Sequence, residues 1–284
     1  MISIRPPDFT TAEVFDACID GAHEDARKRR IHAARQTVLN NEIIYLSRAQ
    51  PNHLDQIEVD FCPPELEDGK DLTWFYTNRF VPRGKGRELY NQILALALGG
   101  DCPLCGCRKA STVDHYLPKE RYPVFSVTPS NLLPACRDCN TNKSSNSPGS
   151  PSELFIHPYF DEINDYRWLH AVVTNEGPST LEFSINEVEA WDEEMQLRVA
   201  YHVKELKLVD EYLYQANRLL RNIISTLNRV HREAGAIGVK SHLLEAERSA
   251  RENYLNNYRA VVCSAWANSD WFCDGGFSSI VNAP

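Results

Sequence analysis

Residues 102–143 read CPLCGCRKASTVDHYLPKERYPVFSVTPSNLLPACRDCNTNK and contain two Cys-x-x-Cys pairs, Cys102 with Cys105 and Cys136 with Cys139. Each pair can present two thiolates from one tight turn, and two such turns complete a tetrahedral four-cysteine zinc site. The gap between the pairs is longer than an ordinary zinc ribbon holds, so we expect a functional segment inside it. Cys107, beside the first pair, is expected to be a bystander.

The segment between the pairs carries residues suited to phosphodiester hydrolysis. His115 can take a proton from water near neutral pH, because a free imidazole has a pKa of about 6.5. Its neighbour Asp114 would point the other way on a strand, so it can bind a metal ion without pairing with the base. Asn140, directly after the second pair, offers a hard carbonyl oxygen. One aspartate and one asparagine leave room for water and phosphate, which suits Mg²⁺.

This pattern resembles the HNH endonucleases. In that family an Asp-His, an Asn-Leu and a Cys-Asn-x-x-Lys are arranged around two knuckles, the tight turns that carry the Cys-x-x-Cys pairs. The resemblance implies a ββα-metal fold in which Asp114 and Asn140 hold the catalytic Mg²⁺ or Mn²⁺ ion and His115 is the general base. It also implies that Asn131 fixes the loop that carries the histidine. Asn140 stands where many relatives have histidine, although asparagine is common there too. The four cysteines would hold a structural Zn²⁺.

Several further residues have open roles. Four basic side chains could each meet a phosphate or merely be solvated: Lys143, Arg137, Lys119 and Arg121. His157 lies in a His-Pro-Tyr segment similar to one found in relatives with this type of core. It could approach the metal ion or the substrate, or it could be a packing or capping histidine.

The pattern leaves other functions open. Asp114 and His115 could be a surface pair on a zinc-stabilised loop, in a module that binds nucleic acid or protein without catalysis. An RNA-cleaving toxin is a third possibility, because a ββα-metal site does not itself discriminate between sugars.

Composition indicates an ordinary globular protein. Hydrophobic residues make up 43% of the 284 residues, and no apolar run approaches the length needed to span a bilayer. We expect a cytoplasmic protein, because no signal peptide is recognisable and clustered cysteines are typical of metal sites in a reducing compartment. Cys18, Cys62, Cys263 and Cys273 are expected to be buried or inert thiols.

The net charge is −9, but residues 79–143 contain ten Lys and Arg against five Asp and Glu. This basic island could be a phosphate-binding face in a chain whose helical flanks are acidic and therefore poor candidates for holding DNA.

We predict an α+β protein with a zinc-stabilised HNH core, 86–160, between a helical region, 1–85, and a region of one hairpin and helices, 161–284. Helical spacing is found over 8–50 and 88–100, and an apolar helix face runs from Leu206 to Val230. Gly235 and Gly238 are expected to break that helix before a second one at 240–267. Residues 167–187 alternate around an Asn-Glu-Gly-Pro turn, which predicts a hairpin.

The predicted substrate is nucleic acid, with DNA expected. The layout of the motif resembles the HNH subunits that accompany ATPases in bacterial phage-defence systems of the Septu type. That resemblance implies an antiviral role and an ATPase partner. The apolar face from Leu206 to Val230 could simply pack on the helix at 240–267, or part of the flanking helical surface could dock such a partner.

Overall fold

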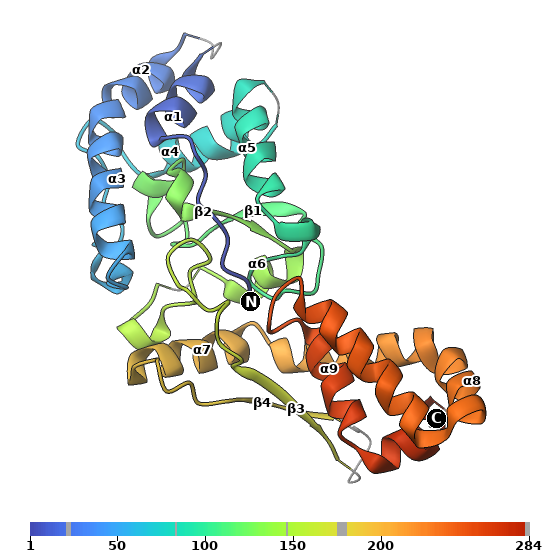
Figure 1. The fold of residues 1–284 in the computed structure, drawn as a ribbon. Coiled ribbons are helices and arrows are strands. Elements are labelled where there is room, and N and C mark those ends of the chain that lie inside the picture. The colour runs from blue at the N-terminus through green and yellow to red at the C-terminus, as the bar shows by residue number, and fades with distance from the viewer. Residues whose placement is uncertain (21–23, 83, 146, 175–180, 282–284) are drawn as a thin grey trace. The chain divides into compact units, whose positions relative to one another are not determined.

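A computed structural model describes residues 1–20, 24–82, 84–145, 147–174 and 181–281. The chain divides into two units: the first comprises residues 1–162 and 197–206, and the second comprises residues 163–196 and 207–284. Helices accompany two small antiparallel sheets, which confirms the predicted α+β class (Figure 1). None of the helices among the described residues is long and apolar enough to cross a membrane.

The N-terminal helical stretch forms three helices: α1 (Thr11–Ile19), α2 (Ala26–Ala33) and α3 (Arg35–Ala49). Thr10 starts α1 with a capping box, in which its hydroxyl accepts from the amide of Glu13 and its own amide donates to the Glu13 carboxylate. Phe15 of α1 packs against Phe75, which lies beyond these three helices in the chain, at a ring distance of 5.0 Å. Each of the three helices buries apolar side chains, among them Phe15, Ile31 and Val38.

Two further helices precede the cysteine-rich stretch. Helix α4 (Lys70–Phe75) continues into a π-helical turn at Tyr76–Phe80, and α5 (Lys85–Ala95) follows. The helix predicted for 88–100 thus ends earlier than expected. Gly99 and Gly100 lie beyond it in a short turn, with φ values of 60° and 83° that favour glycine.

The cysteine-rich stretch forms the ββα arrangement expected for its motif. Strands β1 (Thr112–His115) and β2 (Leu132–Ala135) pair antiparallel, and α6 (Arg137–Lys143) follows directly. Val113 lies opposite Pro134, which has no amide proton to donate.

Two tyrosines outside the motif complete the hydrogen bonding of β1. The Tyr76 hydroxyl donates to the carbonyl oxygen of Val113 at 3.0 Å, and the amide of Val113 donates to the Tyr90 hydroxyl at 3.0 Å. A two-stranded sheet leaves both of its edges unpaired, and a buried unpaired backbone group is costly. Residues from the N-terminal helical region therefore stabilise the strand that carries Asp114 and His115.

A buried ion pair joins the segment after the motif to helix α7 (Glu193–Glu205). Arg198 donates from both terminal nitrogens to the Asp161 carboxylate, at 2.9 and 2.6 Å, and also to the carbonyl oxygen of Phe155. The side chains of Arg198 and Asp161 are almost completely buried. Asp161 additionally accepts from the amide of His157, so the pair fixes the His-Pro-Tyr segment.

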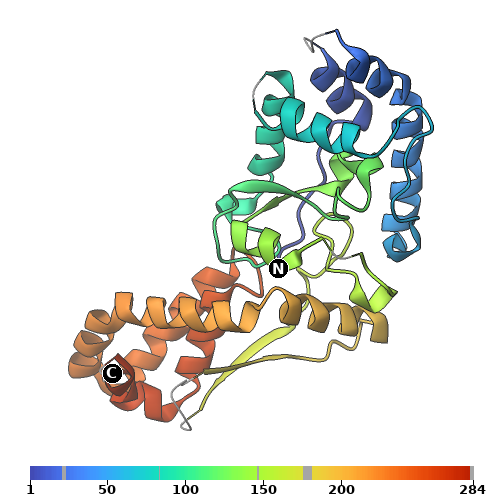
Figure 2. The ribbon, with the colours of Figure 1, turned by 180° about the vertical axis from the view of Figure 1, so that it is seen from behind.

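The second unit contains the hairpin, α8 (Leu208–Arg251), α9 (Tyr258–Ala267) and α10 (Phe277–Val281) (Figure 2). Strands β3 (Leu169–Val173) and β4 (Leu181–Ile185) confirm the predicted hairpin, whereas its predicted turn lies outside the described residues. Asn256 joins the hairpin to the helices, because its side chain accepts from the amides of Trp168 and Leu169 and donates to the carbonyl of Tyr166.

The helix breaks differ in part from the prediction. Gly235 has φ 62° and ψ −160° and kinks α8 where a break was expected. The single helix predicted for 240–267 is wrong, because α8 ends at Arg251 and α9 starts only at Tyr258. Between them, Asn257 caps α9 by accepting from the amide of Arg259, a local hydrogen bond that competes with a continuous helix.

We expect Arg198→Met to destabilise the first unit by about 3–5 kcal/mol, because it leaves the Asp161 carboxylate buried and unpaired. Denaturant unfolding, followed by tryptophan fluorescence and circular dichroism, would measure this change. The control is Lys85→Met, which breaks an exposed 2.7 Å pair with Asp20 and should leave the midpoint almost unchanged. Equal, small effects of the two substitutions would contradict the role assigned to the buried pair.

Candidate active site

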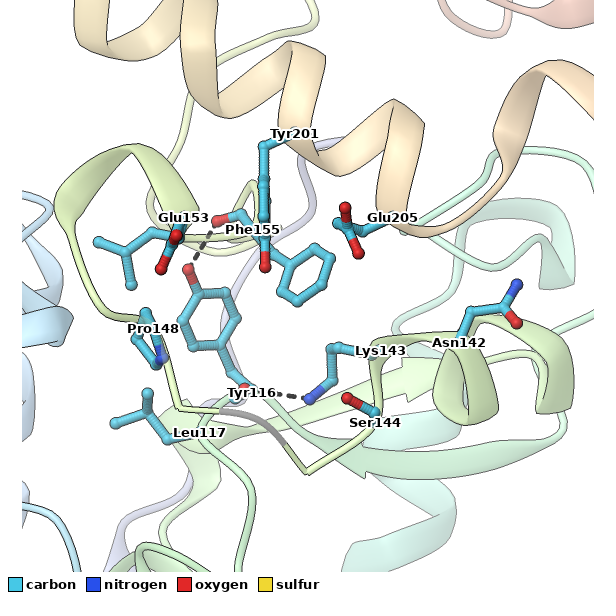
Figure 3. A pocket seen from close by; sticks show the side chains of 11 residues that line it. Tyr116, Leu117, Asn142, Lys143, Ser144, Pro148, Glu153, Phe155, Tyr201 and Glu205 are labelled. Atoms are coloured by element: carbon cyan, nitrogen blue, oxygen red, sulfur yellow. Dashed lines mark hydrogen bonds between the residues drawn. The ribbon is translucent and has the colours of Figure 1, made fainter.

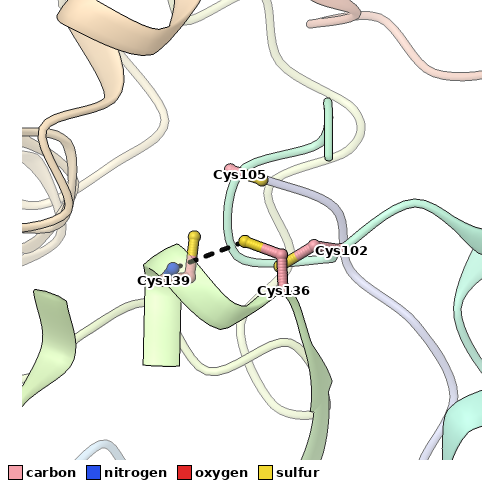
Figure 4. Close-up of side chains that lie close together, drawn as sticks. All are labelled: Cys102, Cys105, Cys136 and Cys139. Carbon is pink, nitrogen blue, oxygen red and sulfur yellow. Dashed lines mark hydrogen bonds between the residues drawn. The ribbon is translucent and has the colours of Figure 1, made fainter. Parts of the chain in front are cut away.

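Four buried thiols converge at the end of the sheet. The Sγ atoms of Cys102, Cys105, Cys136 and Cys139 all lie within 4.8 Å of one another (Figure 4). This is the tetrad predicted from the two Cys-x-x-Cys pairs, and four convergent thiolates suit Zn²⁺. Hydrogen bonds from the thiols of Cys102 and Cys107 lower the pKa of Cys105, whereas burial raises the pKa of Cys102. Cys107 is not one of the four.

Local hydrogen bonds shape both knuckles. In the first, the amide of Gly106 donates to the carbonyl of Cys102 at 2.7 Å, and Gly106 adopts φ 70° to make that turn. In the second, Cys136 caps α6, and its Sγ accepts from the amide of Cys139 at 3.3 Å. The second knuckle is therefore also the start of α6.

His202, on α7, supports the first knuckle and was not identified from the sequence. Its Nε2 donates to the carbonyl of Leu104 at 2.8 Å, and its Nδ1 accepts from the amide of Ile156 at 3.1 Å. Complete burial lowers the pKa of His202 to about 3, so the ring stays neutral. His202 lies one helical turn after Arg198, so the two polar residues share one helix face. That spacing is the sequence pattern that could have indicated a buried polar role for His202.

Asp114 has one carboxylate oxygen in use and one without a hydrogen bond. Oδ1 accepts from the amide of His115 at 2.7 Å. Oδ2 is buried and has no hydrogen-bond partner among the described residues, and the nearest cation is Lys143 Nζ at 3.5 Å. Burial raises the pKa of Asp114, and the charge of Lys143 opposes that shift. A buried, unsatisfied carboxylate oxygen is what a metal ligand leaves when the ion is removed.

His115 is held as a neutral base. Its Nε2 lies 2.9 Å from the carbonyl oxygen of Ser126, which can only accept, so Nε2 carries the proton and Nδ1 is the basic nitrogen. Burial lowers the pKa of His115 to about 3, and the charge of Lys119 adds to that shift, so the ring stays neutral but is a weaker base than the free imidazole assumed from the sequence. The ring of Tyr76 packs edge-on against the imidazole at 4.4 Å. Ser126 and Tyr76 are two site residues that the sequence reasoning missed, because both contacts are non-local.

Asn131 bridges the loop that follows β1. Its Oδ1 accepts from the amide of Leu117 at 2.7 Å, and its Nδ2 donates to the carbonyls of Leu117 and Phe125. The side chain is completely buried. The loop between His115 and Asn131 is therefore closed by a single amide side chain.

Helix α6 brings Lys143 to the end of β1. Lys143 is buried, and its Nζ donates to the carbonyls of His115 at 2.6 Å and Tyr116 at 3.1 Å. Asn140 lies three residues earlier, on the same side of the helix, and is partly buried. These contacts give Lys143 a structural role at the end of β1, in place of the exposed phosphate contact considered from the sequence.

Figure 3 shows a small pocket beside Lys143, lined also by Tyr116, Glu153, Tyr201 and Glu205. The Tyr116 hydroxyl donates to the carbonyl of Phe155 at 2.6 Å. Two carboxylates make this side of Lys143 unfavourable for a phosphate.

The remaining candidates occupy different environments. His157 is buried, with Nε2 3.1 Å from the Tyr45 hydroxyl and Nδ1 accepting from the amide of Tyr159, and its ring stacks on Tyr116 at 4.2 Å. Both ring nitrogens of His157 therefore have hydrogen-bond partners within the protein, as expected for a packing histidine. Lys119 pairs with Glu120, Arg121 pairs with Asp60, and Arg137 is exposed.

Comparison with known proteins supports the identification of the HNH motif. Residues 102–146 match the protein family described as HNH endonuclease, so this stretch is an HNH domain. The chain is 28% identical to protein ea31 of Escherichia phage lambda over 72% of its own length and 74% of that protein. It is 26% identical to Septu protein PtuB of Bacillus thuringiensis over 69% and 76% of the two lengths. No solved structure matches the chain significantly.

We expect Cys102→Ser or Cys139→Ser to lose bound zinc and to unfold the HNH domain, because a structural zinc ion contributes folding free energy directly. Elemental analysis should find about one zinc per wild-type chain. Cys107→Ser is the control and should keep both the zinc and the thermal midpoint. A zinc-free cysteine variant with unchanged thermal stability would contradict the four-cysteine site.

Proposed function

We propose that this protein is an endonuclease that hydrolyses phosphodiester bonds in nucleic acid, with DNA as the substrate, by means of one Mg²⁺ or Mn²⁺ ion. The observation that carries the proposal is the buried, unsatisfied Oδ2 of Asp114 beside a neutral His115. The match of residues 102–146 to the HNH endonucleases supports the same reaction class.

Asp114 and Asn140 would hold the catalytic ion, since a carboxylate and an amide oxygen suit a hard cation. Once bound, that ion would supply positive charge for the phosphate and its leaving oxygen. A single ion is proposed because Asp114 is the carboxylate that the motif supplies at this position.

The protein's own groups would activate the water. His115 Nδ1 would take a proton from water as the water oxygen attacks phosphorus and the phosphodiester bond breaks. The Ser126 carbonyl holds Nε2–H and so keeps the basic nitrogen on the other side of the ring. Asn131 fixes the loop behind the imidazole, and Lys143 holds the backbone of the same strand end. Preorganisation of this kind reduces the cost of reaching the reactive geometry.

Antiviral defence with a partner protein is the proposed setting. The similarity to Septu protein PtuB over 69% of the chain supports it, together with the resemblance of the motif to HNH subunits that accompany ATPases. An ATPase is therefore the proposed partner. All nine cysteines are free thiols, which fits the proposed cytoplasmic location.

Nicking of supercoiled plasmid DNA tests the proposal. The purified chain should nick only with added Mg²⁺ or Mn²⁺, and withdrawal of these ions should stop the reaction while zinc content stays constant. A matched RNA substrate in the same assay distinguishes the RNA-cleaving alternative. Binding of DNA without cutting under every metal condition would favour the non-catalytic knuckle module.

We expect His115→Ala to reduce cleavage to less than a few per cent of the wild-type rate, because the variant lacks the proton acceptor. Zinc content should remain unchanged. His32→Ala, at an exposed histidine of α2, is the control and should retain the wild-type rate. Substantial cleavage by His115→Ala would show that another group activates the water.

Asp114→Ala and Asn140→Ala should each raise the Mn²⁺ concentration needed for half-maximal cleavage, with partial recovery of activity at high Mn²⁺. Zinc should stay bound, because these residues do not contact the four thiols in the proposed arrangement. Asp138→Ala, on the exposed side of α6, is the control and should leave the metal dependence unchanged. Loss of zinc from either site variant would mean that the two metal sites had been confused.

A further inference from the structure

The first half of α8 carries an unusual charge pattern. Residues 212–232 contain four arginines and no aspartate or glutamate, in a chain whose net charge is −9. The apolar side chains Leu220 and Leu227 of this stretch are buried. On most solvated helix faces, basic side chains alternate with acidic ones. In this stretch the arginines have no acidic side chains between them.

These arginines share one exposed side of the helix. Arg218, Arg221, Arg229 and Arg232 are all exposed, and they recur at intervals of three, eight and three residues. At about 100° per residue, they fall within an arc of roughly 80°. Arg229 pairs with Glu233 at 3.0 Å, whereas the structure gives no acidic partner to the other three among the residues it describes.

Other polar and aromatic groups lie on the same side. Asn217, Asn222 and Ser225 are exposed between the arginines, and Tyr214 is 62% exposed one turn before Arg218. Amide and hydroxyl groups donate to phosphate oxygens, and an exposed tyrosine ring can stack on an unpaired base. We call the surface formed by these eight residues, 214–232, the α8 arginine face.

The α8 arginine face has the length of a nucleic-acid contact. From Arg218 to Arg232 the helix rises about 21 Å, at about 1.5 Å per residue. A DNA duplex presents one negative charge per about 1.7 Å of its axis. Guanidinium groups bind phosphates through several directed donors. Charge and hydrogen-bonding groups thus complement a nucleic-acid backbone.

We propose that the α8 arginine face binds the phosphate backbone of the nucleic acid that the HNH domain cuts. The identity of the partner rests on the proposed nuclease function. The inference revises the sequence-based expectation that the helical flanks are poor candidates for holding DNA, because residues 212–232 carry no acidic side chain and Glu233 offsets the charge of Arg229 alone. Contact with phosphates would add affinity without sequence preference.

The test compares two double variants with the same change in charge. Arg218→Ala/Arg221→Ala removes half of the arginines of the face, and Lys240→Ala/Arg248→Ala removes two exposed cations from the other half of α8. Binding of a short labelled DNA duplex is measured by fluorescence anisotropy over a range of salt concentrations, without added Mg²⁺. The same strand, unpaired, is the second probe.

The slope of log K against log salt should become smaller by about 2 in the first double variant, since each phosphate contact contributes about 0.9. The control double variant should keep the wild-type slope. Tyr214→Ser should weaken binding of the single strand more than binding of the duplex. Equal slopes in the wild type and both double variants would overturn the proposal. The α8 arginine face would then bind another partner, such as an acidic protein.

Cleavage measurements separate this proposal from the proposed function. The Arg218→Ala/Arg221→Ala variant should raise KM and leave kcat unchanged, whereas His115→Ala should lose cleavage and keep the wild-type salt slope. A protein that binds through the face but never cuts would contradict the nuclease function alone. A protein that cuts with an unchanged KM in the arginine variant would contradict the face alone.

Discussion

The convergence of four buried thiols is the constraint on which the rest of the HNH domain depends. Cys102 and Cys105 lie before β1, Cys136 caps α6 and Cys139 lies in its first turn, so one ion would join the two ends of the motif. A sheet of only two four-residue strands cannot bury enough apolar surface to fix its own position. With the knuckles joined, the segment that enters β1 and the start of α6 are held together. Lys143, the last residue of α6, then contacts the end of β1 that carries Asp114 and His115.

Within that frame, nearly every buried polar group near the strand end has a partner. Lys143 satisfies two carbonyls, Asn131 satisfies three backbone groups, and Ser126 satisfies one nitrogen of His115. Asp114 Oδ2 has no hydrogen bond among the described residues and meets only Lys143 Nζ, at 3.5 Å, and the hydroxyls of Tyr122 and Thr128 in the following loop also lack a partner there. A well-satisfied network is rigid, and an unsatisfied oxygen within it is costly unless a ligand completes it. The proposed catalytic ion would complete the contacts of this oxygen on Asp114.

Local patterns predicted much of this arrangement. The four-cysteine cluster and the hairpin at 167–187 follow from short-range spacing, the ββα order follows from the resemblance of the motif to HNH endonucleases, and Gly235 marks a real kink. The misses are non-local. Tyr76 and Tyr90 complete the edge of β1, His202 supports Leu104, and Arg198 pairs with Asp161, although sequence separations of about 20 to 100 residues divide the partners. Contacts between residues so far apart leave no periodic pattern in the sequence. The end of α8 at Arg251 was missed because the Asn257 cap competes with helical spacing that continues across it.

The two proposed metal sites differ in ligand chemistry, and anomalous X-ray diffraction tests their separation most directly. Crystals of the zinc-loaded protein, grown with Mn²⁺, would be measured on both sides of the zinc and manganese absorption edges. The account predicts zinc among Cys102, Cys105, Cys136 and Cys139, and manganese in contact with Asp114 and Asn140 but not with the thiols. Manganese absent from Asp114 at a concentration that supports cleavage would contradict it.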